Sequence, residues 1–246
     1  MKRFRWQIIF GVSLISLSVF FYVVQIEIFK TPRDTFFYLF QDLAFVPISV
    51  LMVTVIINEV LNVREKKSLM RKLNMVIGVF FSEVGTTLLK SFPDFYPYYD
   101  RQRINLLINS DWSNHDFNLA RRHVKNYDFE IESQKGDLEG LKNFLMSKRD
   151  FLLRLLENPN LLEHRSFTNL LRAVFHLTEE LGYRKDLGKL PKTDYDHLSG
   201  DIKRVYSSLL SEWLAYMSYL KNYYPYLFSL AVRTNPFDPD AKPEVK

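Results

Sequence analysis

The chain contains no cysteine among its 246 residues. Disulfide bonds, zinc–thiolate sites and thiol nucleophiles are therefore excluded, and the composition suits a reducing compartment. Glycine is also scarce, and none of the eight glycines stands in the GxGxxG or GxxxxGK spacing that binds phosphate groups. The GxSxG and HExxH patterns of hydrolases and zinc peptidases do not occur either. The sequence therefore supplies no motif for nucleotide binding or for these forms of catalysis.

The net charge of +5 is concentrated in one short stretch. Residues 64–72 hold five basic side chains against one acidic side chain, while residues 73–246 are neutral overall. A nucleic-acid-binding domain usually carries a basic face of its own, so we expect no nucleic-acid partner. The basic stretch follows a long apolar segment, which predicts contact with a lipid bilayer and its anionic headgroups. The expected lipid-contacting residues are Arg64, Lys66, Lys67, Arg71 and Lys72.

Residues 6–29 form the first apolar run, which is long enough to cross a hydrocarbon core of ~30 Å. The basic start MKRFR would also suit a cleavable signal peptide. The run is longer than a usual signal-peptide core, however, and no small-residue cleavage site follows it. We therefore predict a retained membrane span over about residues 6–28.

The second predicted span, about residues 38–61, contains Asp42 and Pro47. If the span begins at Leu43, Asp42 lies among the lipid headgroups and residues 36–40 form an interfacial aromatic belt. If it begins at Phe36, the carboxylate lies ~9 Å inside the membrane at ~1.5 Å per residue, where an acid marks a functional site. Pro47 falls near the first helical turn in the first case and kinks the helix in the second.

The positions of the basic residues predict the orientation of this hairpin. Basic residues precede the first span and follow the second, and the turn between the spans is short. By the positive-inside rule, both termini face the cytoplasm. The sequence therefore predicts a multi-pass protein of the cell (inner) membrane.

The remainder of the chain has the apolar periodicity of helices. We predict an all-α protein with a transmembrane hairpin in residues 1–61, a helical-bundle cytoplasmic domain in 62–237 and a disordered tail in 238–246. The second span should continue without a break into a helix over 58–92, and a final helix should run from about Ser199 to Tyr224 after a loop. The aromatic connector 91–100 either packs on the domain or touches the membrane surface. Ser113 or Asn114 is the expected N-cap of a helix.

Glu83 lies close to the apolar face of the predicted helix over 58–92 and is a candidate buried acid. A buried carboxylate needs a partner. The alternative is a glutamate at the edge of that face, or one paired with a basic residue of the core.

The predicted helix from Ser166 to Gly182 raises the question of a metal site, because it carries His176, Glu179 and Glu180. A di-iron site in a helical bundle needs two Glu-x-x-His pairs and two further glutamates that point inward. This helix has one reversed pair, and His176 lies opposite the apolar face. From these residues we predict no metal site, and we assign no catalytic or cofactor-binding residue.

Three stretches carry a resemblance to known proteins: MKRFRWQIIFGVSLISLSVFFY, REKKSLMRKLNMVIGVFFSEVGTTLLK, and SFTNLLRAVFHLTEEL together with YPYLFSLAVRTNPFD. Together they resemble a group of uncharacterised bacterial and archaeal membrane proteins with an N-terminal hairpin and a helical cytoplasmic region. The resemblance covers nearly the whole chain. It implies no activity and transfers no site residues.

Three functions are compatible with these observations. The leading hypothesis is a non-enzymatic scaffold or sensor that binds a protein partner or forms a homo-oligomer. The second is an oligomeric channel or transport component lined by the hairpin, with Asp42 as its polar group. The third is an enzyme at the membrane surface, for which Glu83, Glu179 and Glu180 are the acids to test.

Overall fold

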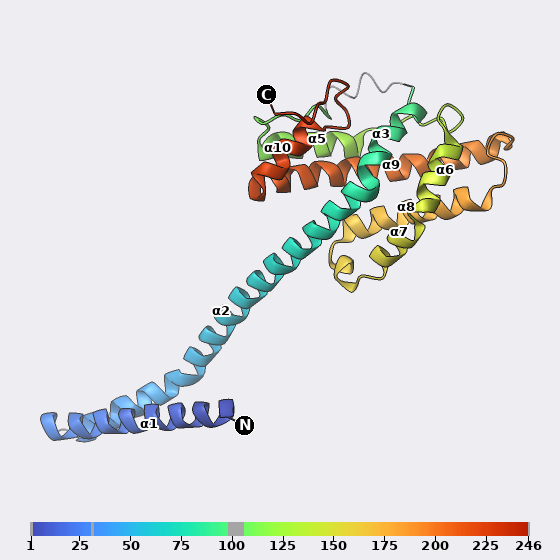
Figure 1. Cartoon of the computed structure of the whole chain (residues 1–246). Coiled ribbons are helices and arrows are strands. Elements are labelled where there is room, and N and C mark those ends of the chain that lie inside the picture. Colours follow the sequence, from blue (N-terminus) through green and yellow to red (C-terminus); the bar gives the residue numbers. More distant parts are fainter. Residues whose placement is uncertain (1, 31, 98–105, 246) are drawn as a thin grey trace. The chain divides into compact units, whose positions relative to one another are not determined.

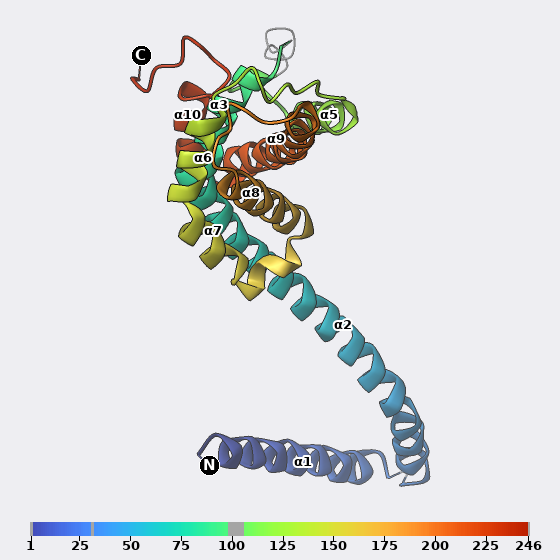
Figure 2. The same cartoon turned by 90° about the vertical axis from the view of Figure 1, so that its right-hand side faces the viewer.

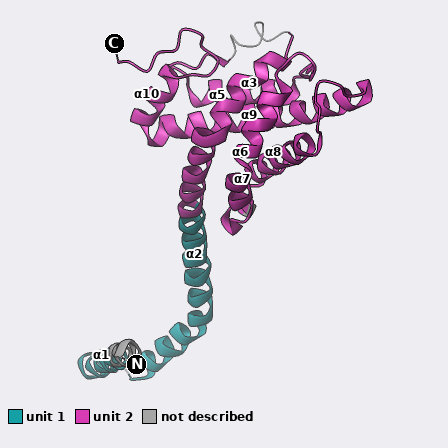
Figure 3. Ribbon diagram, turned by 45° about the vertical axis from the view of Figure 1, so that its right-hand side comes forward, with its two compact units in different colours: residues 1–66 teal, residues 67–246 magenta. Residues whose placement is uncertain are grey.

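The computed structural model describes residues 2–30, 32–97 and 106–245 and is helical throughout (Figure 1). No strand occurs in these three ranges, which confirms the all-α class. The chain divides into two compact units, Met1–Lys66 and Lys67–Lys246 (Figure 3). This division falls within the basic stretch of residues 64–72.

The first unit contains helix α1 (Lys2–Phe29) and the first part of helix α2 (Pro32–Phe80). Helix α1 ends at Phe29, and the next residue, Lys30, has a left-handed φ of 53° while its backbone N–H donates to the Ile26 carbonyl at 2.9 Å. This conformation commonly terminates a helix. By length and composition, both helices could cross a membrane. The most apolar stretch of 18 residues in each helix contains no buried residue. Pro47 lies in the interior of α2, where it lacks the N–H of a normal helical hydrogen bond.

The predicted continuation of the second apolar segment is confirmed, because α2 extends to Phe80 without a break. A π-helical turn, Phe81–Gly85, follows, and the Thr86 N–H donates to the Phe81 carbonyl five residues earlier. The chain continues as α3 (Thr86–Ser91) and a 3₁₀ turn, Phe92–Phe95. Phe80, the last residue of α2, and Phe81, the first residue of the π turn, are both buried.

The second unit is a helical bundle that surrounds its longest helix, α9 (Lys192–Tyr223) (Figures 1 and 2). Four helices pack against α9: α3, α5 (Asn114–Asn126), α8 (Arg165–Tyr183) and α10 (Pro225–Arg233). Helices α6 (Leu138–Ser147) and α7 (Arg149–Leu156) cover α8, and a 3₁₀ turn, Pro159–Glu163, joins α7 to α8. The bundle holds all the buried apolar side chains of the described residues, from Leu73 to Phe237.

Two local predictions are confirmed. Ser113 caps α5, because its hydroxyl accepts the Asp116 N–H while the Asp116 carboxylate accepts the Ser113 N–H. The predicted apolar face of α8 is fully buried, comprising Phe167, Leu170, Leu171, Val174, Thr178 and Leu181.

The start of the final helix differs from the sequence prediction, whereas the connector follows one of the two predicted alternatives where it is described. The final helix begins at Lys192 rather than near Ser199, because Leu198 already faces the core and is fully buried. In the aromatic connector, Phe92, Phe95 and Tyr96 are buried in the bundle, whereas 98–100 lie outside the described residues. The described part of the tail, 238–245, contains no helix, and the Pro243 carbonyl accepts a hydrogen bond from Arg233.

Candidate functional site

Helices α8 and α9 bring together four side chains that can bind a metal ion: His176, Glu180, His197 and Asp201. The two helices lie side by side and run in opposite directions, and the loop 184–191 joins them (Figure 1). Each helix contributes a histidine and, four residues later, a carboxylate. Residues four apart lie on the same face of a helix, so the facing pairs form one cluster.

The distances within this four-residue cluster are short. The Asp201 Oδ2 atom lies 3.5 Å from His176 Nε2 and 3.4 Å from His197 Nε2. The Glu180 carboxylate lies 3.8 Å from His176 Nε2 through Oε1, and 3.5 Å from His197 Nε2 through Oε2. One ligand atom from each residue fits within 4.8 Å of all the others. All four residues can therefore contact one ion or one small group.

The cluster has a buried floor and an open mouth. The side chain of Asp201 is 2% exposed, whereas those of His176 and His197 are 47% and 51% exposed. Asp201 Oδ1 accepts a hydrogen bond from Arg204 Nη1 at 2.8 Å, but Oδ2 has no hydrogen-bond partner. A buried carboxylate oxygen without a hydrogen bond is costly unless a positive charge lies near it. The Arg204 guanidinium supplies one positive charge beside this carboxylate, and Oδ2 is left facing the two imidazoles.

Arg184 holds the second carboxylate of the cluster, that of Glu180, through a hydrogen bond. Its guanidinium donates to Glu180 Oε2 at 2.7 Å and to both oxygens of Asp194 at 2.5 and 2.9 Å. The Arg184 hydrogen bond lowers the pKa of Glu180, and its hydrogen bonds to Asp194 lower the pKa of that carboxyl as well. Both acids are therefore held ionised, and Arg184 joins the end of α8 to the start of α9.

We expect Arg184→Met to lower the free energy of unfolding by about 1.5–3 kcal/mol at neutral pH, because it removes charge-assisted hydrogen bonds. It should also flatten the acid dependence of stability. Since the folded pKa values of Glu180 and Asp194 lie below their ordinary values, their contribution is complete above the ordinary values and is lost as pH falls through the folded ones. Melting temperatures measured from pH 7 to acid test both effects.

A matched control for this prediction is Lys189→Met, since the Lys189 side chain is 87% exposed and lies 4.0 Å from Asp186. An exposed pair of this kind contributes little to stability. If Arg184→Met and the parent lose stability in parallel as the pH falls, Arg184 does not hold the two carboxylates.

The candidate residues Glu83 and Asp42 and the five basic residues do not belong to the four-residue cluster. Glu83 is exposed rather than buried, because the positions of the π turn that face the core are Phe81, Val84 and Gly85. It forms an ion pair with Lys148 at 2.8 Å, with its side chain 49% exposed. Asp42 is exposed, as are the basic residues Arg64, Lys66, Lys67, Arg71 and Lys72.

The two adjacent acids of α8 face different partners. Glu179 accepts a hydrogen bond from Arg149 at 2.8 Å, whereas Glu180 belongs to the four-residue cluster. His176 lies opposite the apolar face, as predicted, but it faces the first turns of α9. His197 falls in the loop that the sequence predicts before Ser199. The helical spacing His197-x-x-x-Asp201 was therefore not predicted. Its similarity to His176-x-x-x-Glu180 is the signal that could have revealed the cluster.

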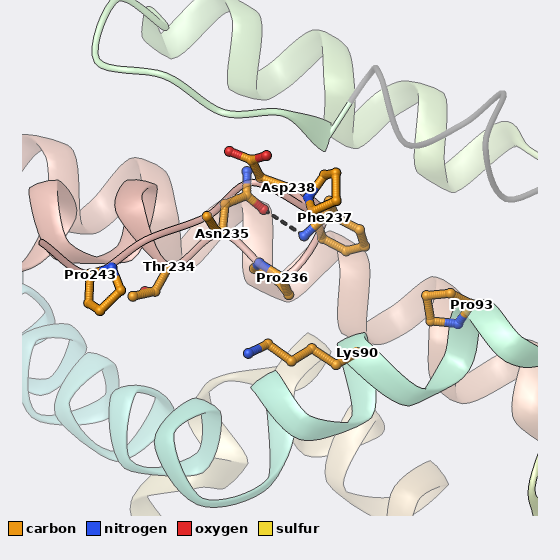
Figure 4. Close-up of a pocket in the computed structure, with 10 residues that line it drawn as sticks. Lys90, Pro93, Thr234, Asn235, Pro236, Phe237, Asp238 and Pro243 are labelled. Atoms are coloured by element: carbon orange, nitrogen blue, oxygen red, sulfur yellow. Dashed lines mark hydrogen bonds between the residues drawn. The ribbon is translucent and has the colours of Figure 1, made fainter.

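Other cavities in the described residues offer less chemistry. One of about 490 Å³ lies between α3 and the segment that follows α10 (Figure 4). Its lining is rich in proline, and the Asn235 side chain accepts the Phe237 N–H at 3.0 Å. Lys90 is its only basic side chain, so no convergent set of reactive groups occurs there.

Comparison with known proteins assigns the chain to a family. Residues 2–61 match the family model described as MJ1433, N-terminal helical domain, and residues 69–233 match that of the uncharacterized protein MJ1433, C-terminal helical domain. The chain belongs to the MJ1433 family. The uncharacterized protein MJ1433 of Methanocaldococcus jannaschii is 47% identical over 234 residues, which cover 95% of this chain and 94% of that protein. No solved structure matches the chain.

Membership of the MJ1433 family confirms the coarse part of the resemblance seen in the sequence. The matched models describe two helical domains, and the relative carries no assigned activity. The identity and coverage imply that the relative shares the helical architecture.

Proposed function

We propose that this chain is an integral membrane protein, anchored by a two-helix hairpin, whose cytoplasmic helical domain acts as a scaffold or sensor. The observation that carries the proposal is the exposure of the hairpin. Twenty-nine large apolar side chains between Val12 and Val63 are at least 36% exposed in the described residues. A helix that is apolar on all sides is expected to be buried in a protein core or in lipid.

The size of this apolar surface argues for lipid. Burying one large apolar side chain stabilises it by about 1.5–3 kcal/mol, so leaving so many in water would cost tens of kcal/mol. A core helix of a soluble domain can be equally apolar. In these two helices, however, 0% of the most apolar stretch is buried by the rest of the chain. A bilayer would bury this apolar surface, and the thickness of its hydrocarbon core matches the length of these segments.

The orientation in this proposal places both termini and the bundle in the cytoplasm. Arg64, Lys66, Lys67, Arg71 and Lys72 are exposed around the unit boundary, where they suit anionic headgroups on the cytoplasmic face. Helix α2 carries the chain from the second apolar segment into the bundle. A ligand or partner of the bundle, including a second copy of the chain, could thereby be held at the membrane.

The lack of cysteine makes this topology directly testable. Single cysteines would be introduced at Arg33, in the predicted external turn, and at Lys189, which is 87% exposed in the loop between α8 and α9. In intact cells, a membrane-impermeant maleimide should label Arg33→Cys and not Lys189→Cys. After lysis both variants should be labelled, while the cysteine-free parent stays unlabelled throughout.

Two results would contradict the proposal. Labelling of Lys189→Cys in intact cells would reverse the orientation. Alkaline carbonate detaches peripheral proteins only. Release of the full chain by this treatment would therefore show that the hairpin is not an integral membrane anchor. Native co-purification tests the scaffold role separately, and it should return a stable partner or an oligomer of this chain.

A further inference from the structure

We propose that His176, Glu180, His197 and Asp201 bind one divalent transition-metal ion, with Zn²⁺ as the best match. This inference goes beyond the membrane proposal and does not depend on it, because all four residues belong to the bundle. The site would join α8 to α9 through the bound ion.

The donor set is the first argument. Two imidazoles and two carboxylates are borderline and hard ligands, and no thiolate is available in this chain. Imidazole suits Zn²⁺ and the neighbouring first-row ions, whereas Mg²⁺ and Ca²⁺ prefer sites made of oxygen ligands alone. Four protein ligands also match the closed coordination of structural zinc sites rather than the open position of catalytic ones.

The spacing of the ligand atoms is the second argument. In a tetrahedral site with bonds of about 2.0–2.1 Å, neighbouring ligand atoms lie about 3.3–3.4 Å apart. Asp201 Oδ2 lies 3.5 and 3.4 Å from the Nε2 atoms of His176 and His197, and Glu180 lies 3.8 Å from His176 through Oε1 or 3.5 Å from His197 through Oε2. With one oxygen taken from each carboxylate, three of these separations belong to one ligand set, whose four atoms lie within 4.8 Å of one another. Small side-chain movements would therefore bring the ligands to tetrahedral distances without a change in either helix.

The third argument is the buried oxygen of Asp201. Oδ2 is directed at both imidazoles and has no hydrogen bond, although its side chain is 98% buried. Arg204 occupies only the other oxygen of Asp201, and Arg184 binds Glu180 Oε2, which leaves Oε1 facing His176. Such outer partners orient carboxylate ligands in metal sites. One oxygen of each carboxylate is thus left available to an ion.

The competing explanation is an ion-pair network in which both histidines are protonated. It would satisfy the same carboxylates without a metal, so the experiment must separate proton binding from metal binding. The exposed histidines allow this, because either can be replaced at the mouth of the cluster without opening the core.

The full chain, purified in detergent and stripped with a chelator, would be titrated with Zn²⁺ at neutral pH. We expect one Zn²⁺ per chain by elemental analysis and a higher melting temperature of the bundle. Co²⁺ should give the intense visible absorption of a tetrahedral site, and Mg²⁺ should produce neither change. Because loss of an outer partner alone weakens metal sites ~10–100-fold, His197→Ala and His176→Ala should each weaken Zn²⁺ binding at least ~100-fold.

The matched control is His115→Ala, which removes an exposed histidine of α5 outside the cluster and should leave Zn²⁺ binding unchanged. Circular dichroism of the metal-free variants establishes that they remain folded. The proposal is overturned if the parent takes up no stoichiometric Zn²⁺, or if folded His197→Ala and His176→Ala bind it as tightly as the parent. The cluster is then an ion-pair network.

Discussion

Replacing Phe80 with alanine is expected to lower the free energy of unfolding of the bundle by about 3–5 kcal/mol. Phe80 is the last residue of α2 and is 0% exposed. Its ring meets that of Phe167 on α8 edge-to-face, with centroids 5.2 Å apart, and that of Phe81 at 5.5 Å. The truncation leaves a cavity that the surrounding rings cannot fill. Chemical denaturation of the full chain in detergent, followed by fluorescence of the buried Trp213, measures the loss.

Val79 provides the matched control for Phe80, because it is the preceding residue of the same helix and is 51% exposed. Val79→Ala should change stability by less than about 0.5 kcal/mol. A double-mutant cycle with Phe167→Ala should give a coupling energy of about 0.5–1.5 kcal/mol for the aromatic pair. If Phe80→Ala lowers the free energy of unfolding no more than Val79→Ala does, the end of α2 is not part of the core.

Under the proposed membrane anchoring, removal of residues 1–66 is expected to give a soluble fragment with little loss of stability. The fragment 67–246 contains every buried apolar side chain of the described residues, because these begin at Leu73. The deleted unit carries the exposed apolar segments. The fragment should therefore stay in the supernatant after ultracentrifugation without detergent, whereas the full chain sediments with membranes.

The stability of the fragment provides the second measurement. Its unfolding transition should match that of the bundle in the full chain, and Phe80→Ala should destabilise both by the same amount. A control deletion of residues 1–30 keeps the second apolar segment and should remain in the membrane fraction. An aggregated or unfolded fragment 67–246 would mean that the first unit contributes to the folding of the bundle.

The sequence alone determined the features that depend on neighbours along the chain. Helical periodicity identified the buried face of α8, the serine cap identified the start of α5, and the lack of a breaker identified the continuity of α2. These features follow from local hydrogen bonding and from the repeat of about 3.6 residues per turn, which a single sequence reveals directly. The family models agree with two helical regions, and the two apolar segments are evident from composition.

The candidate metal site was decided by tertiary structure. His176 was read correctly as facing away from the core, but the sequence did not indicate what lies opposite it. The polar start of α9 resembles a loop, but in the bundle Leu198 is buried and Arg184 binds Asp194 in the first turn of the helix Lys192–Tyr223. Packing α9 against α8 then places His197 and Asp201 beside His176 and Glu180. Such a pairing depends on the register between two helices, because contacts across a bundle are set by how side chains interlock and not by spacing along either helix.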